Sequence, residues 1–242
     1  MSGRPRRALV VVVALLALPT FARAAGAATC APNAAVAATG PRLGALDPEW
    51  RLAFIDGELA RSAHNARVWK WGWSIALGVG AVANLAPLIW VPPDERVDWY
   101  TGAFTNTVGI VPLVIAPLDV IGDSRELQAR LAARGSTDVC TLLADAETRL
   151  VRDAQNQADG RRWWLHVANF ALNAGVGLFL GVGFHHWGAG LFQFASGAVI
   201  GEIIIFTQPT GAIRAAEAYD RGDLSVAAAP TPSWGWAYAA TF

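Results

Sequence analysis

The sequence predicts an all-α integral membrane protein with four transmembrane helices, arranged as two tandem helical hairpins with amphipathic flanking helices. Composition is the first observation: 54% of the residues are hydrophobic and 16% are charged, against about 25% charged in an average soluble domain. The second is a set of four charge-poor runs, each near the length of about 20 residues that a helix needs to cross a bilayer. The third is the gathering of Trp and Tyr at the run ends, typical of membrane–water interfaces. The alternative is a buried helical hairpin in a soluble protein, because several runs are rich in Gly and Ala.

The N-terminus, residues 1–27, is typical of a secretory signal peptide. Arg4, Arg6 and Arg7 precede a short apolar stretch, and "ARA" and "AGA" supply small residues at the spacing of a cleavage site. The sequence therefore predicts export and a bacterial-type envelope protein. The alternative is an uncleaved anchor helix.

After the signal peptide the chain divides into two halves and a tail. The first half, 28–122, holds an amphipathic helix and a hairpin at 71–118, and the second half, 123–222, holds amphipathic helices and a hairpin at 163–208. The charge-poor runs are 71–91, 99–118, 163–184 and 185–208. The Pro/Ala-rich tail, 223–242, ends in alternating aromatic residues that resemble the last strand of an outer-membrane barrel. The helical pattern elsewhere contradicts a barrel.

The amphipathic helices are predicted from start signals and periodicity. Asp47 followed by Pro48 is a standard helix start. At 136–160, residues Val139, Leu143, Ala146 and Leu150 form an apolar stripe on one helical face. We expect such helices at 47–70, 123–134, 136–160 and 210–222.

A short pattern recurs at a spacing of 91 residues. Arg61-x-Ala63-x-Asn65 matches Arg152-x-Ala154-x-Asn156. A fixed offset indicates an internal duplication. With two spans in each half, the halves have the same orientation in the membrane, which makes the repeat parallel.

Two topology rules disagree for this chain. A cleaved signal peptide places 28–70, 119–162 and 209–242 outside the cytoplasm, yet 14 of the 15 Lys and Arg residues after position 27 lie there. The positive-inside rule predicts the reverse. We give the signal peptide more weight, because most of these arginines alternate with acids. The expected location is the inner membrane, with the amphipathic helices facing the periplasm.

Polar residues interrupt the apolar runs at matching depths. Folding the second hairpin about residue 185 brings Glu202 level with His166 and Asn169, and Asn173 continues that polar stripe. An intramembrane ionisable residue is a functional candidate. The competing interpretation, which we favour, is hydrogen bonding between helices, worth about 0.6–2 kcal/mol per bond.

The first hairpin carries a second polar pair, and two cysteines flank the spans. Folding about residue 95 brings Asn84 level with Asn106. Cys30 and Cys140, which are both expected outside the cytoplasm, are a candidate disulfide, with free or intermolecular thiols as the alternative.

No catalytic, metal-binding or cofactor-binding motif is present in the sequence, so we expect no enzyme, metal or cofactor. Zero net charge argues against nucleic-acid binding. The expected partners are the lipid bilayer and either other envelope proteins or a second copy of the chain. The sequence therefore predicts a structural or interaction role in the envelope. The alternative is a small transporter or ion-conducting component that uses Glu202, His166 and Asn169.

Overall fold

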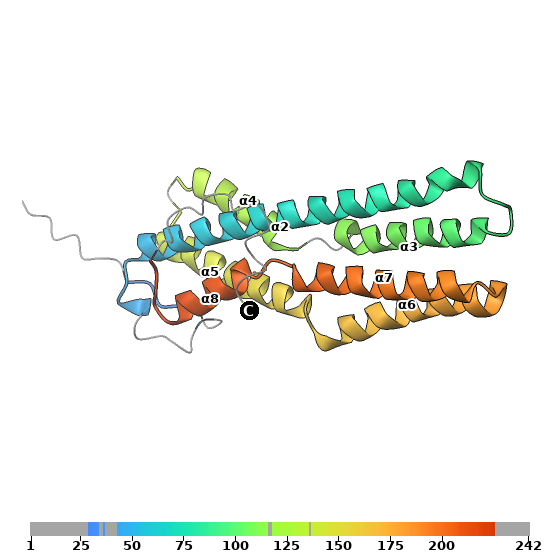
Figure 1. Ribbon diagram of the computed structural model, residues 1–242. Helices are drawn as coiled ribbons and strands as arrows, with labels where there is room; N and C mark the ends of the chain where they lie inside the picture. The colour runs from blue at the N-terminus through green and yellow to red at the C-terminus, as the bar shows by residue number, and fades with distance from the viewer. Residues whose placement is uncertain (1–28, 34–35, 37–42, 116–117, 136, 226–242) are drawn as a thin grey trace, which may run out of the picture.

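The computed structural model describes residues 29–33, 36, 43–115, 118–135 and 137–225 (Figure 1). Regular structure across these ranges is entirely helical, apart from turns. The helices are α2 (Pro48–Leu85), the short 3₁₀ segment η2 (Ala86–Ile89), α3 (Arg96–Ile115), α4 (Val120–Ala132), α5 (Val139–Asp159), α6 (Trp163–Phe184), α7 (Trp187–Phe206) and α8 (Gly211–Asp220). The predicted signal peptide, 1–27, and the tail beyond residue 225 lie outside the described residues.

Helix α2 is one uninterrupted helix, whereas the sequence pattern separates a polar helix at 47–70 from a span that begins at 71. Asp47 caps it by accepting a hydrogen bond from the Trp50 backbone amide at 3.0 Å. No proline follows Pro48 until Pro87, where the 3₁₀ segment begins. The change from polar to apolar residues alters what the helix contacts, but it does not break the backbone hydrogen bonding.

The equivalent junction in the second half is broken. Helix α5 ends at Asp159 and α6 begins at Trp163. Gly160 lies at this break, and a Cβ there would come within 2.2 Å of the Gln208 side chain. Arg161 donates a hydrogen bond to the Gln208 carbonyl at 3.1 Å. The second half therefore joins its polar and apolar helices through a packed turn.

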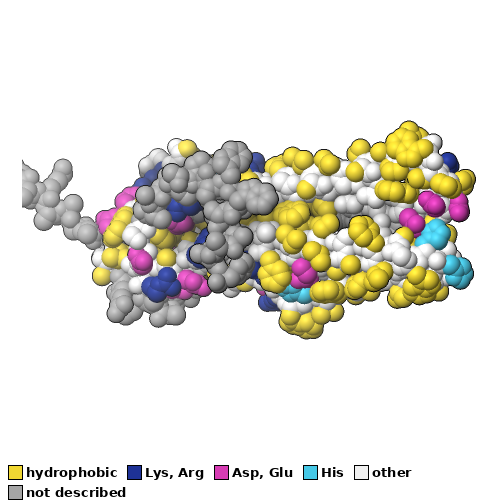
Figure 2. All heavy atoms as spheres, in the orientation of Figure 1, with side chains coloured by type: hydrophobic (Ala, Val, Ile, Leu, Met, Phe, Trp, Pro, Cys, Tyr) yellow, Lys and Arg dark blue, Asp and Glu magenta, His cyan; other side chains and the backbone are white. Residues whose placement is uncertain are grey.

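The long helices form two antiparallel pairs that extend away from a helical head (Figure 1). The first apolar pair is α2 with α3, and the second apolar pair is α6 with α7. Among the residues that the structure describes, four helical segments are long and apolar enough to cross a membrane. Nearly all exposed large hydrophobic side chains lie within 68–115 and 163–206, Trp50 being the exception among the described residues. Figure 2 shows apolar side chains over the paired helices and many charged ones at the head.

The head consists of residues 48–70 of α2 together with α4, α5, α8 and the segment that carries Cys30. Its apolar core includes Ile55, Leu59, Leu127 and Leu150, each fully buried. Burying one such side chain stabilises the fold by about 1.5–3 kcal/mol. Leu143, Ala146 and Leu150 of the stripe expected on α5 all lie in this core.

A disulfide joins Cys30 to Cys140, with the two Cα atoms 5.3 Å apart. It fastens the segment that precedes α2 to the first turn of α5. The two cysteines are separated by 110 positions in sequence, so the bond lies in the head and closes a long loop that includes the first apolar pair.

Candidate functional site

Glu202, the acid inside the last apolar run, lies against the three polar residues of α6. Its Oε2 is 2.5 Å from His166 Nδ1, and its Oε1 accepts a hydrogen bond from Asn169 Nδ2 at 2.9 Å. Asn169 Nδ2 also donates to the Ala198 carbonyl at 2.9 Å. Asn173 Nδ2 donates to the Asn169 side-chain oxygen at 2.9 Å. The structure thus brings together Glu202, His166, Asn169 and Asn173, hereafter the Glu202 cluster.

The Glu202 cluster lies at the head end of the second apolar pair, close to the start of α6 and the end of α7. The side chains of His166 and Glu202 keep 26% and 19% of their exposure. The His166 ring lies 5.3 Å from the ring of Phe206, centroid to centroid. Within the described residues, the one buried side-chain atom of the cluster without a hydrogen-bond partner is Asn173 Oδ1.

Asparagines pack against glycines in the second apolar pair. A Cβ on Gly197 would lie 1.9 Å from Asn173 Oδ1, and one on Gly201 would lie 2.0 Å from Asn169 Oδ1. Only glycine leaves room for these amides, because any larger residue would have to displace them. The Asn173 amide therefore faces the backbone of α7 directly.

The first apolar pair holds Asn84 and Asn106 in a reciprocal arrangement rather than in a direct pair. Asn84 Nδ2 donates to the Gly80 carbonyl at 2.8 Å, and Asn106 Nδ2 donates to the Gly102 carbonyl at 2.9 Å. The Asn106 side-chain oxygen lies against Gly80, because a Cβ on Gly80 would meet it. In the same way, the Asn84 side-chain oxygen lies against Gly102. No hydrogen bond joins the two asparagines. The pairing expected from their equal depth is therefore made through the two glycines.

Two sets of polar contacts fasten the apolar pairs to each other, one at each end. At the head end, Trp69 and Trp73 donate from their indole nitrogens to Thr207 Oγ1 at 3.2 and 3.1 Å. At the far end, His186 Nδ1 lies 2.8 Å from Asp98 Oδ1. Sequence reasoning missed this contact, because His186 and Asp98 are 88 positions apart. Within the described part of the chain, no group of three or more His, Cys, Asp or Glu residues is placed to hold a metal ion.

A buried polar network closes the head beside the disulfide. Arg51 donates from Nε to the Tyr219 hydroxyl at 2.8 Å and from Nη1 to the Cys30 carbonyl at 2.9 Å. Glu147 pairs with Arg51, accepts from Tyr219, and accepts the Asn33 backbone amide at 2.7 Å. Burial and the Glu147 carboxylate raise the pKa of Tyr219 well above its usual value. Sequence reasoning missed this network, because its members come from four distant segments.

Asp153 is a second buried acid of the head, and its surroundings differ. It is 0% exposed, and neither carboxyl oxygen has a hydrogen-bond partner among the described residues. Beside it, Asp123 pairs with Arg149 at 3.0 Å and with Arg152. Burial, followed by the charge of Asp123, raises the pKa of Asp153 to about 8. The carboxyl is therefore mostly protonated at neutral pH.

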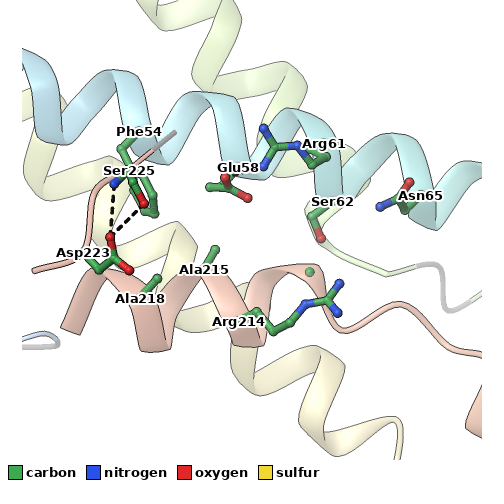
Figure 3. A pocket seen from close by; sticks show the side chains of 11 residues that line it. Phe54, Glu58, Arg61, Ser62, Asn65, Arg214, Ala215, Ala218, Asp223 and Ser225 are labelled. Carbon is green, nitrogen blue, oxygen red and sulfur yellow. Dashed lines mark hydrogen bonds and ion pairs between the residues drawn. The ribbon is translucent and has the colours of Figure 1, made fainter. Parts of the chain in front are cut away.

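Two hollows open on the head surface. One, of about 280 Å³, lies between α2 and α8, with Glu58 and Ser62 on one side and Arg214 on the other (Figure 3). The other, of about 490 Å³, is lined from α2, α4 and α5. Within the described residues, neither hollow places a Ser, Thr or Cys nucleophile beside a histidine base.

The distribution of polar groups separates the molecule into three chemical environments. The head interior holds the Arg51–Glu147–Tyr219 network and the unbonded carboxyl of Asp153. The Glu202 cluster is confined to one end of one apolar pair, and the hollow lined from α4 and α5 carries cations at the head surface. No family model, curated protein or solved structure matches this chain.

Proposed function

We propose that the chain is a membrane-anchored protein of the bacterial-type cell envelope with a structural or interaction role. In this proposal, two helical hairpins span the inner membrane and hold the head in the periplasm. One observation carries it: a head closed by a disulfide and a buried ion network stands on helices whose outward faces are apolar. The apolar faces suit lipid as their solvent, because the backbone hydrogen bonds are satisfied within each helix.

The disulfide supports a periplasmic location for the head. Disulfides form and persist in oxidising compartments such as the periplasm, and the Cys30–Cys140 bond agrees with the export signal predicted at residues 1–27. Many arginines of the head lie beside carboxylates, as Arg149 does with Asp123 and Arg134 with Glu49. The charges of these guanidinium groups are therefore neutralised locally by partners in the head.

The interaction role is assigned to the head. Its interior polar groups are largely bonded to one another, so its exposed helical faces are the surfaces left for contact with other envelope proteins or a second copy. The far end offers less to a partner, because the connections between the paired helices are short: residues 90–95 in the first pair and 185–186 in the second.

Topology mapping tests the proposal. Reporters inserted after residues 95, 140 and 225 are expected to be cytoplasmic at 95 and periplasmic at the other two. The chain should also resist alkaline carbonate extraction from membranes. A cytoplasmic signal at 140 would overturn the assignment of the head to the periplasm, and release by carbonate would overturn the membrane anchor.

Ion or proton conduction through the Glu202 cluster is the second candidate. An ionisable pair within a span favours it, as does the unbonded Asn173 Oδ1. The hydrogen bonding within the cluster argues against conduction, because Glu202 already binds both His166 and Asn169 at one end of the second apolar pair. We therefore assign the cluster to helix–helix bonding.

Proton flux into liposomes separates the two roles. The comparison uses the wild-type protein, Glu202→Gln, and Glu95→Gln as a control in an exposed far-end loop. Bonding between helices predicts no flux from any of the three, with lower thermal stability for Glu202→Gln alone. Flux that Glu202→Gln abolishes in a folded protein would establish conduction instead.

A further inference from the structure

The hollow lined from α2, α4 and α5, called here the boundary hollow, lies where the apolar runs meet the head. Lys70 lines it from α2 and is followed in sequence by the uncharged run 71–91. Leu118 lines it at the end of the apolar run 99–118. If the apolar runs span the bilayer, the boundary hollow lies at the level of the lipid headgroups.

Aromatic side chains mark the same level. Trp69 and Trp73 bond Thr207 at the end of α7, and Trp163 and Trp164 begin α6. Trp rings are enriched at the membrane–water interface because they join an apolar body to a polar edge. The position of the boundary hollow therefore follows from both the apolar runs and the tryptophans.

Three cations from three helices line the boundary hollow. Lys70, the single lysine of the chain, is half-buried, and its ammonium lies 5.6 Å from the centroid of the Trp71 ring. Arg125 is exposed and donates from Nε to the Ile121 carbonyl at 3.4 Å. Neither forms an ion pair with a carboxylate among the described residues. The third cation, Arg152, is shared with Asp123.

The acids of the boundary hollow do not cancel these charges. Asp123 is already paired with Arg149 and Arg152. Asp119 is exposed, and its side chain makes no capping bond to α4. Among the described residues, three cations and two carboxylates give the lining a net charge of +1. Asp153 behind it adds little negative charge at neutral pH, because its pKa is raised to about 8.

We infer that the boundary hollow binds the phosphodiester of a glycerophospholipid headgroup, with Lys70 and Arg125 as its cations. The inference rests on the proposed membrane anchor, which places lipid phosphates at this level. Lys and Arg bind phosphate oxygens through charge-assisted hydrogen bonds, and each cation near a membrane surface favours anionic lipid. The volume of about 490 Å³ falls within the range of small-molecule sites.

Asp119 adds a preference among headgroups. Its carboxylate is free to accept a hydrogen bond from an ammonium or hydroxyl beside the lipid phosphate. Ethanolamine and glycerol headgroups carry such donors, whereas the trimethylammonium of choline has none. Phosphatidylglycerol and phosphatidylethanolamine are therefore expected to bind more tightly than phosphatidylcholine.

Native mass spectrometry of the full chain in neutral detergent tests the site, with dioctanoyl forms of the three lipids and inorganic phosphate as probes. Lys70→Gln and Arg125→Gln are each expected to weaken phosphatidylglycerol binding about 5-fold. Arg67→Gln is the matched control, since Arg67 is an exposed cation one turn away on α2 and outside the hollow. It should change the affinity less than about twofold. Asp119→Ala, which removes the acceptor, should remove the preference for phosphatidylethanolamine over phosphatidylcholine.

The outcomes separate the site from its alternatives. Equal binding of all three lipids would overturn the inference, because a headgroup site must discriminate among them. An equal loss in Arg67→Gln would also overturn it, because a diffuse surface charge would explain that loss. Inorganic phosphate that competes at the same affinity would overturn the lipid source while retaining the phosphate chemistry. If Lys70→Gln misfolds, Arg125→Gln carries the test, since its side chain is exposed. Release of the chain from membranes by carbonate would refute the membrane anchor itself. Retention of the chain in membranes, together with equal binding of the three lipids, would refute only this site.

Discussion

Asp153 makes the stability of the head depend on pH in a direction opposite to that of most acids. Its pKa is raised from an ordinary 3.8 to about 8, because the carboxyl is buried and lies beside the Asp123 carboxylate. For an acid whose folded pKa is raised, stability is complete below the unfolded pKa and is lost as the pH rises toward the folded pKa. The window of loss therefore runs from about pH 4 to about pH 8.

The magnitude follows from the width of this window. Each pKa unit corresponds to about 1.4 kcal/mol, so ionisation of Asp153 in the unfolded chain, while the folded carboxyl keeps its proton, removes about 4 kcal/mol of folding free energy between pH 5 and pH 8. Asp153→Asn keeps the shape of the protonated acid and carries no charge. Its stability advantage over the wild type should be small at pH 4 and should grow by about 4 kcal/mol between pH 5 and pH 8.

Urea unfolding of the full chain in neutral detergent, followed by near-ultraviolet circular dichroism at several pH values, measures this advantage. Asp159→Asn is the matched control: it makes the same change on α5 at an exposed side chain that pairs with Arg162 at 2.9 Å. Its effect should stay below about 1 kcal/mol at every pH. A stability advantage of Asp153→Asn that does not vary with pH would refute the reasoning. A buried carboxyl with a raised pKa must make the stability of the wild type fall as the pH rises.

Three further perturbations have defined outcomes. Reducing the Cys30–Cys140 disulfide should lower the free energy of unfolding by about 4–5 kcal/mol, because the bond closes a loop of 110 residues; a change below 1 kcal/mol in urea unfolding would contradict this. Glu147→Gln should cost about 3–5 kcal/mol, since it leaves a buried guanidinium without its charge partner; calorimetry measures it, and an unchanged melting temperature would count against the network. Gly197→Ala should lower the melting temperature in detergent by crowding the asparagine amide it faces, at about 1–3 kcal/mol, whereas Gly175→Ala, which meets open space, should not; equal shifts would show that the amide contact is unimportant.

The apolar helices and the Glu202 cluster are the features that sequence reasoning approached most closely. The run expected at 163–184 has the same bounds as α6, because hydropathy and aromatic ends are local properties. His166 and Asn169 lie at the depth of Glu202 because two antiparallel helices rise equally per residue from a shared turn. Depth alone does not specify hydrogen-bond geometry, which explains why the asparagines of the first pair contact glycines instead of each other.

The head interior lay beyond sequence reasoning for a different reason. Arg51, Glu147 and Tyr219 are brought together by packing between α2, α5 and α8, and no local spacing connects them. One signal was available: Glu147 lies four residues after Leu143, on the apolar face of α5. A charged residue on a buried face requires a partner, but the partner's identity depends on the tertiary arrangement.

The uninterrupted α2 gives the two halves unequal mechanical properties. Its 38 residues extend about 57 Å at 1.5 Å per residue, so the helix acts as a stiff lever shared by the head and the first apolar pair. Tilting it by about 10° would displace one end by about 10 Å relative to the other. The second half transmits motion through a turn at residues 160–162, which acts as a joint. A tilt of the apolar pairs would therefore displace the head mainly through α2.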